Sequence, residues 1–117
     1  MFELNANRIV YLHRDAIDFR KNINGLASLV EHALGMNAFG NAVFVFGNRR
    51  KDRIKILGWD RNGLWLLQKR LENARFVWPG KDSPVVELTV QQLHWLLNGI
   101  DLSAMRGHAA VTYQRAA

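Results

Sequence analysis

The sequence contains no cysteine and only two prolines, and its ten acidic residues are outnumbered by sixteen lysines and arginines. The absence of cysteine excludes disulfide bonds and thiolate metal sites, and it agrees with a reducing compartment. No apolar run approaches the ~20 residues of a membrane-spanning helix, and the N-terminal residues lack the apolar core of a secretion signal. We therefore expect a cytoplasmic protein, with nucleoid association compatible with that location, and no membrane contact.

Motifs for catalysis and cofactor binding are also missing. No GxGxxG or GxxxxGK(S/T) loop is present, so nothing in the sequence supports nucleotide binding. The four histidines are scattered without metal-ligand spacing, and the serines have no neighbouring base that would activate a nucleophile. We expect no cofactor, no metal site and no catalytic residue, and hence a protein that is not an enzyme.

Lysine and arginine are concentrated in one segment. Residues 49–81 hold ten of the sixteen basic residues against three acids, together with Phe76 and three of the four tryptophans. The segment carries a net charge of +7, whereas the whole chain carries +6. Such a segment is typical of a surface that binds a polyanion, because clustered cations release counterions from phosphates and aromatic rings offer stacking surfaces.

Length and hydrophobic pattern together predict an α+β fold. A chain of 117 residues with 49% hydrophobic residues can form one folded domain, expected over residues 1–105, while weak periodicity predicts a mobile tail over residues 106–117. We expect an antiparallel β-meander of about five strands with two main helices packed on one face. The helices begin after the cap residues Asn22 or Asn24 and Thr89. The strand-like segments are residues 8–13, 43–46, 53–59, 64–71, 75–78 and 85–88.

Side-chain alternation along the strands predicts which residues are buried. A loop over residues 48–52 pairs Phe46 with Ile54, and Asn62-Gly63 closes the next hairpin. The buried face that results consists of Phe44, Phe46, Ile54, Ile56, Trp65 and Leu67.

The same antiparallel path brings cations from several strand ends to one edge of the sheet. Only Asp52 and Glu72 oppose them, and crowded like charges contribute nothing to folding. We therefore predict an edge that binds DNA with low sequence specificity. The nucleic-acid-binding residues expected there are Arg49, Arg50, Lys51, Arg53, Lys55, Lys69, Arg70 and Arg75.

Three other interpretations stay open. The cations can simply solvate the sheet, with Arg53 paired to Glu72 or Arg70 to Asp52. A Mg²⁺-dependent nuclease would need the carboxylates of Asp52, Asp60 and Glu72 to converge, although the meander places Asp60 at the far turn. An apolar patch can instead dock a protein partner. That patch consists of Leu57, Trp59, Leu64 and Leu66.

A resemblance to a known family rests on one long block and two flanking motifs. Residues 44–57 read FVFGNRRKDRIKIL, residues 18–27 read DFRKNINGLA, and residues 96–101 read LLNGID. Over residues 8 to 102 the chain resembles the second-reading-frame accessory proteins, called TnpB, of the insertion sequence 66 family. The RNA-guided nuclease of the same name is a different and larger protein.

The resemblance implies a transposition accessory domain of a bacterial mobile genetic element. Such a protein assists transposition, a form of DNA recombination, beside a separate transposase. The expected partners are then DNA, the transposase and other element-encoded proteins. The family supplies no catalytic or binding residues, so the site residues named above depend on the charge pattern alone.

Overall fold

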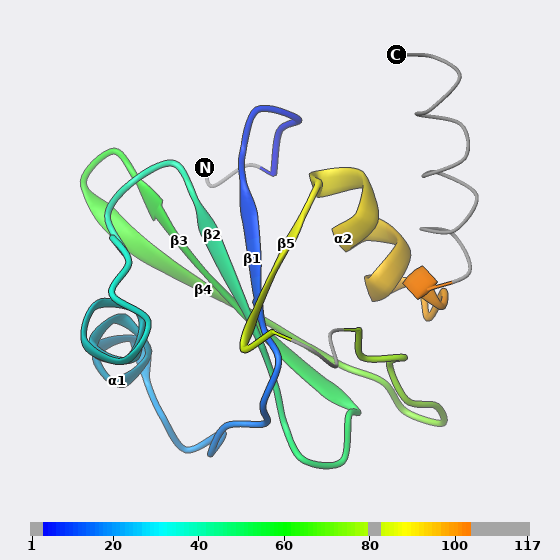
Figure 1. Cartoon of the computed structure of the whole chain (residues 1–117). Helices are drawn as coiled ribbons and strands as arrows, with labels where there is room; N and C mark the ends of the chain where they lie inside the picture. The colour runs from blue at the N-terminus through cyan, green and yellow to red at the C-terminus, as the bar shows by residue number, and fades with distance from the viewer. Residues whose placement is uncertain (1–3, 80–82, 104–117) are drawn as a thin grey trace.

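The computed structural model describes residues 4–79 and 83–103, which form one five-stranded sheet with helices on both sides (Figure 1). The predicted α+β class, single domain and five strands are confirmed. The tail predicted over residues 106–117 lies outside the described residues. The elements are β1 Val10–His13, α1 Ile23–Ser28, η1 Leu29–Ala33, β2 Val43–Gly47, β3 Arg53–Asp60, β4 Gly63–Arg70, β5 Val85–Leu88 and α2 Val90–Leu97.

The sheet is mixed, in the order β4-β3-β2-β1-β5, and is not antiparallel throughout. Strand β1 runs parallel to β2, with Val10 beside Val43, and antiparallel to β5. The chain between β1 and β2 passes through α1 and η1, and a crossover of this kind returns the chain to the same end of the sheet. The predicted meander is therefore correct for β2, β3 and β4 and wrong for β1.

The two helices cover opposite faces of the sheet, which corrects the prediction that both pack on one face (Figure 1). Val45 of β2 packs in one core cluster with Leu93 of α2. Its neighbour Phe44 packs in a second cluster with Leu26 of α1. All five residues of β2 are buried, as expected for a central strand that is covered on both faces.

The register of β2 against β3 is shifted by one residue from the predicted one. Phe46 lies opposite Lys55, not opposite Ile54. A shift of one residue moves every side chain of a strand to the other face of the sheet. Phe44 and Phe46 therefore belong to the face that α1 covers, whereas Ile54 and Ile56 belong to the face that α2 covers.

The predicted parity of β3 against β4 is confirmed, because Leu67 lies opposite Ile56 on the same face. The prediction that Trp65 and Leu67 are buried is wrong: they are 42% and 39% exposed. Strand β4 lies at the edge of the sheet, beyond the cover of α2, so these side chains remain at the surface.

The first helical segment changes geometry half-way. Asn22 caps α1, since its Oδ1 accepts a hydrogen bond of 3.0 Å from the Gly25 amide. In η1, a π-helix, the Leu34 amide donates over 3.1 Å to the Leu29 carbonyl, five residues earlier. The wider turn leaves Ala33 exposed and interrupts the apolar stripe that an ideal α-helix would continue.

Helix α2 matches its prediction. Thr89 Oγ1 accepts from the Gln92 amide over 3.0 Å, and Gln92 Oε1 accepts from the Thr89 amide over 2.9 Å, which completes a capping box. Gly99, with φ of +81°, follows the helix in the left-handed conformation. Within residues 4–79 and 83–103, neither this helix nor any other is long and apolar enough to cross a bilayer.

Residues 75–78, predicted as a strand, do not pair with β4. The Phe76 amide donates to the Lys51 carbonyl over 2.7 Å, so the segment lies against the β2–β3 loop. The Trp78 indole covers Gly47 and donates from Nε1 to the His13 carbonyl over 3.2 Å. These contacts hold the segment across the end of the sheet and leave the outer edge of β4 unpaired within the described residues.

Candidate nucleic-acid interface

The β2–β3 loop is organised by the side chain of Asn48. Its Oδ1 accepts from the amides of Asp52 and Arg53, each over 3.1 Å, and its Nδ2 donates to Asp52 Oδ1 over 2.6 Å. Arg49 and Arg50 remain exposed at the tip of this loop. The role of Asn48 was not predicted from the sequence, although asparagine at the start of a short loop often bonds to the following backbone.

The segment that follows β4 lies beside this loop. The Leu71 amide donates to the Asp52 carbonyl over 2.8 Å, and Phe76 bonds to the Lys51 carbonyl as described above. A polar hollow of about 460 Å³ lies between the two segments. Its lining residues are Arg50, Asp52, Leu71, Glu72, Asn73, Ala74 and Arg75.

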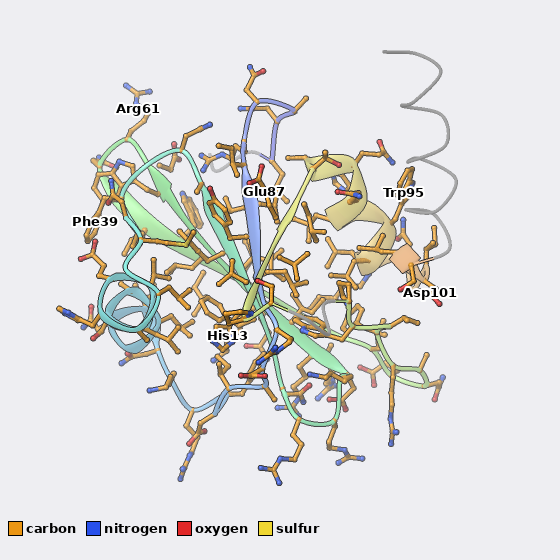
Figure 2. All side chains as sticks on the ribbon, viewed as in Figure 1. His13, Phe39, Arg61, Glu87, Trp95 and Asp101 are labelled. Atoms are coloured by element: carbon orange, nitrogen blue, oxygen red, sulfur yellow. The ribbon has the colours of Figure 1, made fainter. Side chains whose placement is uncertain are left out.

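Two further arginines are paired in the β3–β4 ladder next to this loop, where Arg53 of β3 lies directly opposite Arg70 of β4. Arg70 Nε donates to Glu72 Oε2 over 3.0 Å, which matches neither of the ion pairs considered from the sequence. In Figure 2, side chains with nitrogen tips project around the β2–β3 loop at the lower end of the sheet. We call this group the basic edge. It consists of Arg49, Arg50, Arg53, Arg70 and Arg75.

Asp52 lies within the β2–β3 loop, between the arginines of the basic edge. The hydrogen bond from Asn48 lowers the pKa of the Asp52 carboxyl below its usual value, and the charges of Arg50 and Arg53 lower it further. Asp52 therefore stays ionised at neutral pH and offsets part of the local positive charge.

Lys55, predicted in the basic edge, is buried and only 7% exposed. Its Nζ donates to the carbonyl oxygens of Phe19 and Lys21 over 2.7 and 2.9 Å, and it lies 4.9 Å from the centroid of the Phe19 ring. Burial lowers the pKa of Lys55, and the charge of Asp18 opposes that shift. The segment before α1 covers this lysine, a long-range contact that strand alternation does not reveal.

The side chains of the other two predicted lysines make contacts outside the basic edge. Lys69 is on the opposite face of β4 from Arg70 and donates to the Leu97 carbonyl over 2.8 Å. Lys51 adopts a φ of +61° and places its Nζ 5.0 Å from the centroid of the Trp78 ring. Burial lowers the pKa of Lys51. The structure thus brings together five of the eight predicted cations.

The predicted apolar patch is only partly at the surface. Leu57 is fully buried beneath α1 and cannot contact a partner, which corrects its assignment to an exposed site. Trp59, Leu64 and Leu66 are half-buried on the same face. The Phe39 ring, 47% exposed, meets the Trp59 ring edge-on with centroids 5.5 Å apart.

Comparison with known proteins identifies the family. The family described as "IS66 Orf2 like protein" (TnpB_IS66) matches residues 8–107. The chain belongs to the IS66 Orf2-like family. Two similar proteins come from Sinorhizobium fredii (strain NBRC 101917 / NGR234). "Uncharacterized protein y4hO" is 33% identical over 101 residues, covering 86% of this chain and 88% of that protein. "Uncharacterized protein y4jC" is 31% identical over 90 residues, covering 77% of each. No solved structure matches significantly.

Membership of the IS66 Orf2-like family confirms the resemblance found in the sequence and indicates an accessory protein of an insertion sequence. The matched residues include every strand and helix from β1 to α2. They also include the complete basic edge, so the surface described above is part of the family domain.

The carboxylates of this IS66 Orf2-like protein are not arranged as a metal site. Asp60 lies at the opposite end of β3 from Asp52 and accepts from Trp65 Nε1 over 3.2 Å. Among the residues that the structure describes, no three histidine, aspartate or glutamate side chains form a group that could hold a metal ion. The convergence of Asp52, Asp60 and Glu72 that a nuclease would need is therefore not found in this part of the chain.

Proposed function

We propose that this IS66 Orf2-like protein assists transposition by binding DNA through the basic edge, without catalysing strand transfer. The observation that carries the proposal is the direct opposition of Arg53 and Arg70 in the β3–β4 ladder. Like charges directly opposite each other in a sheet destabilise it, so the pairing does not help folding. Phosphates of a nucleic acid backbone would neutralise such a pair.

Acidic residues compensate the basic edge only weakly. The Arg70 and Glu72 side chains are 57% and 70% exposed, and an ion pair so exposed contributes little. In the part of the chain that the structure describes, Arg49, Arg50 and Arg75 take part in no ion pair. These three side chains are therefore available to phosphates.

The way the basic edge is built favours contact with the DNA backbone over readout of bases. Its residues come from two loops and from the ends of β3 and β4. The described helices carry no lysine or arginine that could enter a major groove. Contacts of this kind position a protein on DNA without reading its sequence, so we propose low sequence specificity.

The direct test is DNA affinity measured by fluorescence anisotropy over a series of salt concentrations. Five phosphate contacts predict a slope of log K against log salt of about −4 to −5. The double variant Arg50→Gln/Arg75→Gln should reduce the affinity at least tenfold and make the slope less steep by about 2. Arg61→Gln is the matched control, because Arg61 projects from the β3–β4 turn at the other end of the hairpin (Figure 2).

Two results would contradict the proposal. One is the absence of salt-sensitive DNA binding by the folded protein at low ionic strength. The other is a loss of affinity in Arg61→Gln that is as large, per charge removed, as in the double variant, which would mean that net charge, and not the basic edge, attracts the DNA.

An adaptor that docks the transposase is the second candidate, favoured by the exposed Phe39 ring packed on Trp59. With Leu57 excluded, the docking surface would combine these rings with Leu64 and Leu66. Phe39→Ser and Trp59→Ala should then abolish retention of the transposase in a pull-down while DNA affinity stays unchanged. If retention persists in both variants, this candidate is wrong.

A further inference from the structure

Strand β4 presents a long unpaired edge. Its inner side forms a regular ladder with β3 from Asp60 opposite Gly63 to Arg53 opposite Arg70. Within the described residues no strand lies on its outer side, where the backbone donors and acceptors of alternate residues point outward. An uninterrupted edge of this kind can accept another strand.

The two edges of the sheet differ in how well they are protected. Strand β5, at the other edge, has four residues, follows Pro84 and carries the exposed Glu87. Short length, proline and charge are the usual means of protecting an edge. Strand β4 has eight residues and contains no proline, and its only charges are Lys69 and Arg70 at its end. It therefore has the features of an edge with a partner.

Apolar side chains on β4 support this interpretation. Trp65 and Leu67 stand side by side on one face of the strand, 42% and 39% exposed. Single exposed apolar residues are common, but two adjacent large ones on an unprotected edge gain from being covered by an added strand.

We propose that β4 pairs antiparallel with β4 of a second copy of this chain, forming a continuous ten-stranded sheet across a two-fold axis. In an antiparallel pair, opposed residues either both point their hydrogen-bonding groups at each other or both point them away. When two copies of one strand pair in this way, the residue numbers of opposed residues must therefore differ by an even number. The exposed face with Trp65 and Leu67 then continues into the same face of the second copy.

One register fits both the apolar and the charged residues. With Leu66 opposite Leu66 of the second copy, Trp65 lies opposite Leu67 of the other chain and Leu67 opposite its Trp65. The same register places Lys69 opposite Gly63 of the second copy. Each copy then covers the exposed side chains of the other.

Charge complementarity favours a second copy as the occupant. Gly63 lies beside Asp60 in the ladder, and Asp60 is on the same face as Lys69. A Cβ built on Gly63 meets nothing within 4 Å, so a lysine side chain has room to pass over it. The Cα atoms of Lys69 and of Asp60 in the second copy would be two strand spacings apart, about 10 Å, a span that the two side chains can bridge. Lys69 would exchange its exposed bond to Leu97 for this carboxylate.

Sedimentation velocity of the full chain over a wide concentration range tests the proposal. The natural sequence should form a dimer that dissociates on dilution. Leu67→Lys should weaken self-association at least tenfold. Val77→Lys is the matched control, because Val77 is also 42% exposed but lies outside β4, and it should dimerise normally. Circular dichroism checks that both variants are folded.

A charge exchange tests the register itself. Lys69→Asp and Asp60→Lys should each weaken the dimer, whereas an equimolar mixture of the two variants should form a heterodimer with two opposite-charge contacts. Hydrogen exchange of the unmodified protein should show β4 amides gaining protection as concentration rises. A chain that is monomeric at every concentration, a Leu67→Lys dimer as stable as the control, or β4 amides insensitive to concentration would each overturn the proposal. DNA is not needed in these experiments, so their outcome is independent of the proposed function.

Discussion

The ammonium group of Lys55 lies 2.7 Å from the carbonyl oxygen of Phe19. Together with the bond to Lys21, this contact joins the segment before α1 to the middle of β3. A cation in this position holds two backbone segments together and is only 7% exposed. Lys55 is therefore a structural residue, although Arg53, two positions earlier, belongs to the basic edge.

Lys55→Met should lower the free energy of unfolding by about 2–4 kcal/mol, because two backbone carbonyls lose their charged donor in a buried place. Urea denaturation measures the change, and Lys21→Met, an exposed position, is the control. The DNA affinity of the folded variant should stay within about twofold of the original, since a buried ammonium releases no counterion from phosphates. A stable Lys55→Met protein with a much weaker DNA affinity would show that this lysine contacts DNA.

Gly47→Ala should destabilise the protein by about 1–3 kcal/mol, as overpacking of a filled site does. A Cβ at this position would lie 2.8 Å from the Trp78 ring, which is too close for a rigid indole to tolerate. Gly40→Ala is the comparison, because its new Cβ would meet only Asn37 Nδ2 at 3.5 Å. If Trp78 is the cause, Gly47→Ala combined with Trp78→Leu should be less destabilising than the sum of the single changes. Additive effects in thermal or urea unfolding would exclude it.

Asp52→Asn separates DNA binding from nuclease activity. Removing this carboxylate should increase DNA affinity, by about twofold to fivefold, since it leaves Arg50 and Arg53 less neutralised. A Mg²⁺-dependent nuclease predicts the opposite kind of result, namely cleavage by the original protein that both EDTA and this substitution abolish. Anisotropy and a plasmid cleavage assay on the same two proteins distinguish the outcomes.

Acid should destabilise the protein partly through Asp18. Its carboxylate accepts from the Arg20 side chain over 2.6 Å and from the Arg20 amide over 2.9 Å, and these bonds hold its pKa well below the usual value. Because the folded pKa is the lower one, the unfolded chain binds the proton first as pH falls. The contribution is complete above the unfolded pKa of about 3.9 and is lost as pH falls toward the folded value.

The measurement is the free energy of unfolding from pH 6 down to acid for the original protein, Asp18→Asn and Arg20→Gln. The original protein should lose more stability below about pH 4 than either variant. Equal slopes in all three proteins would show that this pair does not contribute.

Local signals predicted the elements that local contacts determine. The Thr89 capping box lies within four residues of sequence, so α2 could be placed from the sequence. The β3–β4 hairpin is similarly local, and the predicted parity of its faces is confirmed, although the turn residues are Arg61 and Asn62 and not the predicted Asn62 and Gly63. The register of β2 against β3 was predicted wrongly because it depends on the loop between them. In that loop the Asn48 side chain accepts a hydrogen bond from the Asp52 amide, and Lys51 adopts a left-handed backbone conformation that is uncommon for lysine.

Contacts between distant segments account for the remaining errors. The residues that cover Lys55 are more than thirty positions away in the sequence, and no periodicity in either segment predicts this contact. Arg75 reaches the basic edge through a loop bonded to Lys51 and not through a fourth strand of the meander. Trp65 and Leu67 have the alternation of buried residues, but the sequence does not show that their strand lies at the edge.

The parallel placement of β1 beside β2 has a consequence for how the chain acquires its structure. Strands β2, β3 and β4 are joined by short turns and can associate as soon as each is available, with little entropy lost in closing the loops. Strand β1 can be paired on both sides only after β2 and β5 are available, because Val10 lies opposite Val43 on one side and Leu88 on the other. We therefore expect the β2–β3 and β3–β4 hairpins to form early, and β1 to pair with both of its neighbours only after most of the chain has left the ribosome.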